Sequence, residues 1–180
     1  MKLGKILYVK NREEWRRWLE KNHEKETEIW LIHYRKFSKK TSIPYNDSVE
    51  EALCFGWIDS IEKGIDKERF AQRFSPRKAK SNWSPMNMER MRRLIKKGKM
   101  TPAGLKYFKD DQVFKIPLDI AKAFIEDKKI WFNFQKFPES YKRIRIGWID
   151  GARKRPEEFQ KRLRYFLRMT AKNKMFGMVK

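Results

Sequence analysis

The spacing of apolar residues along the first part of the chain alternates between strand-like and helix-like patterns. Residues 5–10 and 28–37 are short apolar runs rich in β-branched and aromatic residues, which is typical of strands. Between them, Asn11 is placed to cap a helix in which Trp15 and Leu19 recur at helical spacing. This part of the chain therefore predicts a strand, a helix and a second strand.

A second helix and two further strands follow. Ser48 and Glu51 form a capping box that predicts the start of a short helix, and Gly56 is placed to end it. Residues 57–65 and 69–74 then read as two strands joined by a tight turn. The order β-α-β-α-β-β favours an α+β layer over a doubly wound sheet.

From residue 84 onward the pattern is helical. Proline stands at or next to the expected start of five helices, at Pro85, Pro102, Pro117, Pro138 and Pro156. The fold class that we predict is α+β, with a small N-terminal β-α-β-α-β-β layer followed by a helical C-terminal half.

The domain boundary is expected in a stretch without a strong pattern, residues 109–116. We predict an α+β core domain over residues 1–112 and a helical segment over residues 113–180, packed on or beside it.

The composition indicates a globular, strongly basic protein. Lys and Arg number 45 against 23 Asp and Glu, which gives a net charge of +22, and 13 Phe, 7 Trp and 6 Tyr can fill a core. No stretch approaches the ~20 apolar residues that span a bilayer, and the N-terminus lacks the apolar region of a signal peptide. We expect no membrane span and a cytoplasmic location.

Residue types that commonly carry catalysis are scarce. The single cysteine, Cys54, excludes an internal disulfide, and the only histidines, His23 and His33, are too few for a histidine-based metal site. Motifs typical of nucleotide binding, zinc proteases and serine hydrolases are absent. We therefore assign no catalytic residue, no metal and no cofactor. Whether the chain is an enzyme stays open.

The densest group of chemically capable side chains lies between Phe55 and Ser84. Arginine recognises carboxylates and phosphates, and tryptophan offers a stacking face, so this group could hold an anionic small ligand. The candidate ligand-binding residues are Trp57, Asp59, Ser60, Arg69, Gln72, Arg73, Ser75, Arg77 and Trp83. In the structural alternative, Asp59 pairs with Arg73 across neighbouring strands and the tryptophans belong to the core.

Positive charge is concentrated in two stretches, residues 77–99 and 139–180. Such faces suit phosphate backbones, and the candidate nucleic-acid-binding residues are Lys78, Lys80, Arg92, Arg93, Lys96 and Lys97. A lysine-rich solvated surface without a partner explains the same pattern.

Several motifs resemble one known family. The runs EEALCFGWIDS, RFAQRFSPRKAKSNWS and MTPAGL, over residues 9 to about 108, and the segment SYKRIRIGWIDGARKRPEEFQKRLRYF near the end resemble the bacteriocin-protection family, also called YdeI/OmpD-associated proteins. The resemblance implies a role in bacteriocin protection or stress resistance and supplies no catalytic residues. A charge of +22 opposes direct capture of a cationic toxin.

Three functions remain open at this point. The first is binding of an anionic small molecule by the Trp/Arg/Asp cluster, and the second is non-specific nucleic-acid binding through the basic helical faces. The third is an enzyme in which Asp59 acts as acid or base.

Overall fold

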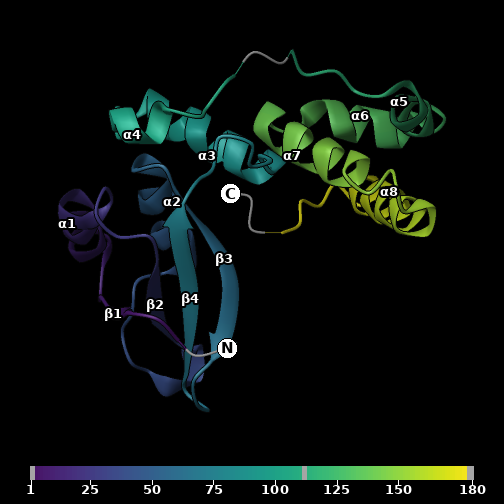
Figure 1. The fold of residues 1–180 in the computed structure, drawn as a ribbon. Coiled ribbons are helices and arrows are strands. Elements are labelled where there is room, and N and C mark those ends of the chain that lie inside the picture. Colours follow the sequence, from purple (N-terminus) through teal and green to yellow (C-terminus); the bar gives the residue numbers. More distant parts are fainter. Residues whose placement is uncertain (1–2, 111–112, 178–180) are drawn as a thin grey trace. The chain divides into compact units, whose positions relative to one another are not determined.

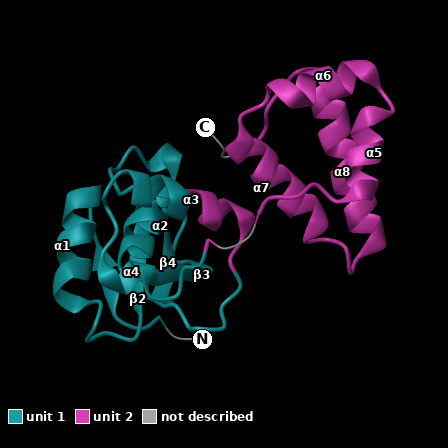
Figure 2. Ribbon diagram, turned by 90° about the horizontal axis from the view of Figure 1, so that it is seen from above, with its two compact units in different colours: residues 1–82, 90–109 teal, residues 83–89, 110–180 magenta. Residues whose placement is uncertain are grey.

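The computed structural model describes residues 3–110 and 113–177. It divides into two compact units, which Figure 2 shows in different colours. The first unit comprises residues 1–82 and 90–109, and the second unit comprises residues 83–89 and 110–180.

The first unit contains a sheet with helices, in the predicted order (Figure 1). Its elements are β1 (Ile6–Tyr8), α1 (Arg12–Asn22), β2 (Ile29–Tyr34), the 3₁₀ helix η1 (Lys36–Ser38), α2 (Tyr45–Cys54), β3 (Trp57–Gly64), β4 (Arg69–Pro76), the later part of α3 (Pro85–Lys96) and α4 (Pro102–Leu105). The prediction of an α+β fold with a helical C-terminal half is confirmed.

The four strands form one sheet in the order β1-β2-β4-β3. β1 runs parallel to β2, and the other two pairings are antiparallel. Trp15 of α1 packs its ring 5.5 Å from that of Phe74, which pairs with Ile29. Because side chains alternate along a strand, Ile29, Leu31 and Phe74 share the face that α1 covers.

The predicted start of α1 is confirmed, whereas the predicted start of α2 is wrong. Asn11 caps α1 by accepting a hydrogen bond from the Glu14 backbone N–H at 2.9 Å, as the sequence predicts. α2 begins at Tyr45, three residues before the predicted cap. Ser48 lies inside the helix and donates back to the Tyr45 carbonyl at 2.8 Å, so its hydroxyl caps nothing.

The second unit is a helical assembly around an aromatic core. Its helices are α5 (Leu118–Ile125), α6 (Lys128–Lys136), α7 (Glu139–Asp150) and α8 (Pro156–Ala171), together with residues 83–89 of the α3 region. The rings of Phe124 and Phe134 lie 4.5 Å apart, and Phe166 contacts both. The sequence pattern does not predict α6, although Asp127 caps this helix and Phe134 is buried on it.

Within residues 3–110 and 113–177, no helix combines the length and the apolar character needed to cross a bilayer.

Candidate functional site

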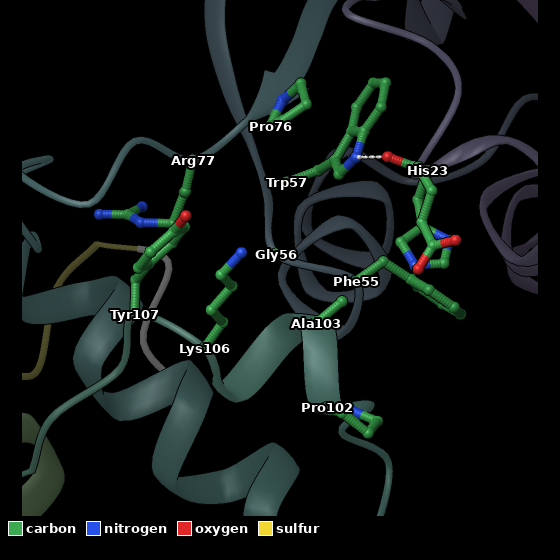
Figure 3. A pocket seen from close by; sticks show the side chains of 11 residues that line it. His23, Phe55, Gly56, Trp57, Pro76, Arg77, Pro102, Ala103, Lys106 and Tyr107 are labelled. Atoms are coloured by element: carbon green, nitrogen blue, oxygen red, sulfur yellow. Dashed lines mark hydrogen bonds and ion pairs between the residues drawn. The ribbon is translucent and has the colours of Figure 1, made fainter.

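A pocket of about 500 Å³ opens in the first unit where four segments converge (Figure 3). The segments are the end of α1, the start of β3, the end of β4 and α4 with the residues after it. The lining residues are His23, Glu24, Phe55, Gly56, Trp57, Pro76, Arg77, Pro102, Ala103, Lys106 and Tyr107.

The base of the pocket depends on a glycine. Gly56 has a φ of +73°, and a Cβ built on it would lie 2.6 Å from the carbonyl oxygen of Ala103. A side chain at this position would therefore be strained by the backbone and would push α4 away. The Arg77 backbone N–H donates to the Gly56 carbonyl at 2.8 Å, which ties the end of β4 to the same turn.

Backbone hydrogen bonds also hold α4 against the end of α2. Thr101 caps α4, and both its backbone N–H (3.1 Å) and its hydroxyl (2.6 Å) donate to the Cys54 carbonyl. Gly104 lies directly against that carbonyl and leaves no room for a Cβ. The loop that carries Lys106 and Tyr107 is thereby brought to the pocket from a distant part of the sequence.

One wall of the pocket is aromatic. The rings of His23 and Phe55 lie 5.2 Å apart, and Trp57 is almost fully buried behind them. Trp57 Nε1 donates to the His23 carbonyl at 3.1 Å, the bond drawn in Figure 3. His23 Nδ1 lies 2.8 Å from the Leu19 carbonyl, which can only accept, so Nδ1 carries the proton in this contact.

The opposite side of the pocket carries positive charge. Arg77 is only 5% exposed and donates through Nη2 to the Asn82 carbonyl at 2.8 Å. Burial lowers the pKa of Arg77, and the negative charge of Asp59 partly offsets this effect. Lys106 is exposed and extends its ammonium group toward the Gly56 turn (Figure 3).

Asp59 and Arg73, which the structural alternative paired with each other, have different partners. Asp59 accepts a hydrogen bond from the Tyr45 hydroxyl at 2.6 Å, and burial together with this bond raises the pKa of Tyr45. Arg73 donates to Glu28 through Nε (2.7 Å) and pairs with it through Nη2 (2.6 Å). The expected Asp59–Arg73 pair is therefore wrong, because Glu28 on the approach to β2 reaches Arg73.

The remaining members of the predicted ligand-binding cluster are spread along the hairpin and beyond it. Arg69 pairs with Asp66 in the turn between β3 and β4, and Ser60 lies beside Arg73 at 3.4 Å. Gln72 is buried in the sheet, Ser75 lies near the end of β4, and Trp83 belongs to the second unit. Of the nine predicted residues, only Trp57 and Arg77 line the pocket.

The six basic residues considered for nucleic-acid binding have mixed surroundings. Lys78, Lys80, Lys96 and Lys97 are exposed, Arg92 is half-buried, and Arg93 pairs with Glu50 of α2. Arg93 is therefore engaged within the first unit, and nucleic-acid binding by this set stays a prediction.

The two other residues weighed for chemistry are buried. Cys54 has no exposed surface, and burial raises the pKa of its thiol to about 11, which keeps it in the unreactive thiol form at neutral pH. His33 is buried against Phe70, with ring centroids 5.1 Å apart, and its Nδ1 lies 3.1 Å from the Ile43 carbonyl.

Comparison with known protein families matches each of two parts of the chain to a family model. Residues 7–107, which contain the pocket, match the family model described as Domain of unknown function (DUF8412). The chain belongs to this family. Residues 113–173 match a second model, described as Bacteriocin-protection, YdeI or OmpD-Associated. No curated protein and no solved structure gives a match.

The second match confirms the family resemblance found in the sequence. The motifs that carry the resemblance lie largely in residues 9–108, whereas the bacteriocin-protection model matches the α5–α8 region and a separate model covers the earlier part. The DUF8412 family is by description of unknown function, so the matched families supply no substrate and no catalytic residue.

Proposed function

We propose that the first unit is a binding module for a small organic anion with a flat, apolar body. The body would lie against the aromatic wall of His23 and Phe55, and the anionic group would face Arg77 and Lys106. The observation that carries the proposal is that two cationic side chains and several aromatic rings line one pocket.

The size of the pocket supports a small-molecule ligand. Small-molecule sites measure about 300–1,000 Å³ and combine apolar walls with a few polar groups. The volume of about 500 Å³ and the mixture of Phe55, Trp57 and Tyr107 with Arg77 and Lys106 agree with this description.

The burial of Arg77 supports an anionic ligand. Taking a guanidinium out of water disfavours its charged form, which is why burial lowers the pKa of Arg77. An anion in the pocket would favour the charged form, so ligand binding and the charge of Arg77 would stabilise each other. Lys106, exposed at the rim, adds a second charge that can follow the ligand.

The position of Asp59 argues against the catalytic alternative. Asp59 does not line the pocket and is occupied by the Tyr45 hydroxyl. A general acid or base needs hydrogen-bond reach to its substrate. We therefore favour binding over catalysis for this site.

Thermal-shift and calorimetric titrations with three naphthalene probes test the proposal. We expect 2-naphthoate and 2-naphthyl phosphate to bind and stabilise the protein, and the uncharged 2-naphthamide to bind at least about tenfold more weakly, a difference of about 1.4 kcal/mol. Equal binding of all three probes, or binding of none, contradicts the proposal.

Two lysine variants provide the matched comparison. Lys106 lines the pocket, whereas Lys109 is exposed close by and does not line it. Lys106→Met should weaken 2-naphthoate binding several-fold, and Lys109→Met should leave it unchanged. A similar loss in both variants would mean that only the overall charge matters.

A role in bacteriocin protection or stress resistance, carried out in the cytoplasm, belongs to the same proposal. Its bacteriocin-protection part is supported by the match of residues 113–173 to the bacteriocin-protection family model. In this role the pocket would hold a small anionic metabolite or inhibitor, and the second unit would contribute its own surface.

A further inference from the structure

The outer surface of α8 carries an uninterrupted row of cations. Lys161, Arg164 and Arg168 lie on the helix, and Lys172 follows at its C-terminal cap. At 100° per residue these four side chains fall within a sector of about 80°. All four are exposed, and we call this row the α8 stripe.

The opposite face of α8 is fully committed to the core of the second unit. Phe159, Leu163 and Phe166 are buried in the cluster that also holds Phe124 and Tyr141. Because the whole helix is fixed by this packing, the α8 stripe faces solvent whichever conformations its long side chains adopt.

Carboxylates of the second unit pair with arginines outside the α8 stripe. Arg143 makes a two-pronged contact with Glu89 at 2.6 and 2.9 Å, and Arg162 donates to Glu158 at 2.7 Å. Arg153 likewise binds Asp119 and Asp150. Over the described part of the chain, no such ion pair within 4 Å involves a member of the stripe.

Further positive charge borders the stripe at both ends. Lys154 and Arg155 are exposed just before α8, and Lys174 is exposed just after it. Within α8, the exposed Glu157 lies on the same side, in the first helical turn, where negative charge stabilises the helix end. The surface is thus cationic from Lys161 to the C-terminal end of the helix.

We propose that the α8 stripe binds the phosphate backbone of double-stranded nucleic acid without reading its sequence. Residues 161 to 172 span about 16 Å at 1.5 Å per residue. About five phosphates of one strand lie along that length of duplex, at 3.4 Å per phosphate. Four cations thus lie along a length of duplex that holds about five phosphates of one strand, which suits contact with the backbone.

The structure favours nucleic acid over an anionic membrane. A helix that binds in a membrane interface inserts apolar side chains beneath its charged face. On α8 those side chains, including Leu163 and Phe166, are buried in the protein. The stripe also lies in the second unit, so this inference is independent of the anion pocket in the first unit.

Fluorescence titration of a labelled 20-base-pair DNA duplex, at several salt concentrations, tests the proposal. Each phosphate contact contributes about −0.9 to the slope of log K against log salt. The triple variant Lys161→Gln/Arg164→Gln/Arg168→Gln should lose about 2.7 from the magnitude of that slope, and its affinity at 50 mM salt should fall more than about tenfold.

Two matched variants separate a binding surface from net charge and from misfolding. Lys21→Gln/Lys25→Gln/Lys67→Gln removes the same charge from exposed positions of the first unit and should retain the slope. Arg164→Lys/Arg168→Lys keeps the charge of the stripe and should bind nearly as tightly as the unaltered protein. Circular dichroism checks that every variant is folded.

Each remaining outcome overturns the proposal. These are no duplex binding at 50 mM salt, an equal loss of slope in the two charge-removal triples, or a slope unchanged by removal of the stripe. Binding to phosphatidylglycerol vesicles that outcompetes the duplex, and that depends on the same three residues, would assign the stripe to membranes instead.

Discussion

The first unit buries a carboxylate between two arginines, whereas the second unit buries an arginine among aromatic rings. Glu51 is 1% exposed and accepts hydrogen bonds from Arg12 at 3.1 Å and Arg16 at 2.9 Å. Arg145 is 7% exposed, and its guanidinium carbon lies 4.3 Å from the centroid of the Phe176 ring.

The difference follows from the partners that each unit provides. In the first unit, α1 and α2 bring opposite charges together, and the resulting pairs help to join the two helices. In the second unit, Arg145 lies over the rings of Tyr141, Trp148 and Phe176, and burial lowers its pKa. Cation–π contact compensates only part of the cost of burying that charge. We therefore expect the first unit to depend on ion pairs and the second on aromatic packing.

Truncation of the aromatic core should produce the largest loss of stability. Phe166 has no exposed surface and contacts Phe124, Phe134 and Tyr141. Phe166→Ala should lower the free energy of unfolding by about 3–5 kcal/mol, measured by urea denaturation. Hydrogen exchange should place the loss in the amides of α5–α8. An equal loss in the sheet would remove the distinction between the units.

Removing the buried carboxylate should produce the next largest effect. Glu51→Gln leaves Arg12 and Arg16 without that charge, and because both arginines keep some exposure we expect a loss of about 2–3 kcal/mol. Glu24→Gln is the control, since the Glu24 side chain is 83% exposed and should change stability by less than about 0.5 kcal/mol. If both variants behave alike, the buried pairs do not stabilise the first unit.

Acid should weaken the first unit through His33. Burial lowers the pKa of His33 below its usual 6.5. Just below pH 6.5, His33 is therefore protonated in the unfolded chain and still neutral in the folded chain. The stability associated with His33 is therefore complete above pH 6.5 and decreases as the pH falls below it, by at most about 1.4 kcal/mol per pH unit. Urea midpoints at pH 7.5, 6.5 and 5.5 should show this slope, and His33→Gln should flatten it. An unchanged slope in that variant would assign the pH dependence to other groups.

Replacing the buried arginine should produce the smallest effect. Arg145→Met removes a charge that burial disfavours and retains an apolar side chain of similar length, so we expect a change in unfolding free energy of less than about 1 kcal/mol. A loss as large as that of Glu51→Gln, in the same urea assay, would show that the aromatic rings hold Arg145 as firmly as an acid would.

The sequence predicted most of the fold because its signals are local. Asn11 before a helical pattern and proline at positions such as Pro85 and Pro156 mark helix starts through hydrogen bonding and a fixed φ angle, which need no distant contact. Two misses are also local. Ser48 looks like a cap but lies inside α2, and no proline or glycine separates α6 from α5, although Pro138 separates it from α7.

The pocket could be predicted only in part because it forms by tertiary contact. Trp57 and Arg77 stand in the motif-rich stretch and were predicted. Lys106 and Tyr107 reach the same pocket only because Thr101 and Gly104 attach α4 to the Cys54 carbonyl, a contact between residues 47 or more positions apart. The sequence signal for this contact was the small residues that meet there, Gly56 and the Ala103-Gly104 pair of the run TPAG.

The central claim is that an aromatic anion binds in the pocket of the first unit. Titration of ¹⁵N-labelled protein with 2-naphthoate, followed by two-dimensional NMR, tests it most directly. We predict saturable shifts concentrated on the amides of residues 55–57, 77 and 106–107, and weaker binding in Lys106→Met. Shifts confined to α8, or no saturable shift at millimolar probe, would contradict the claim.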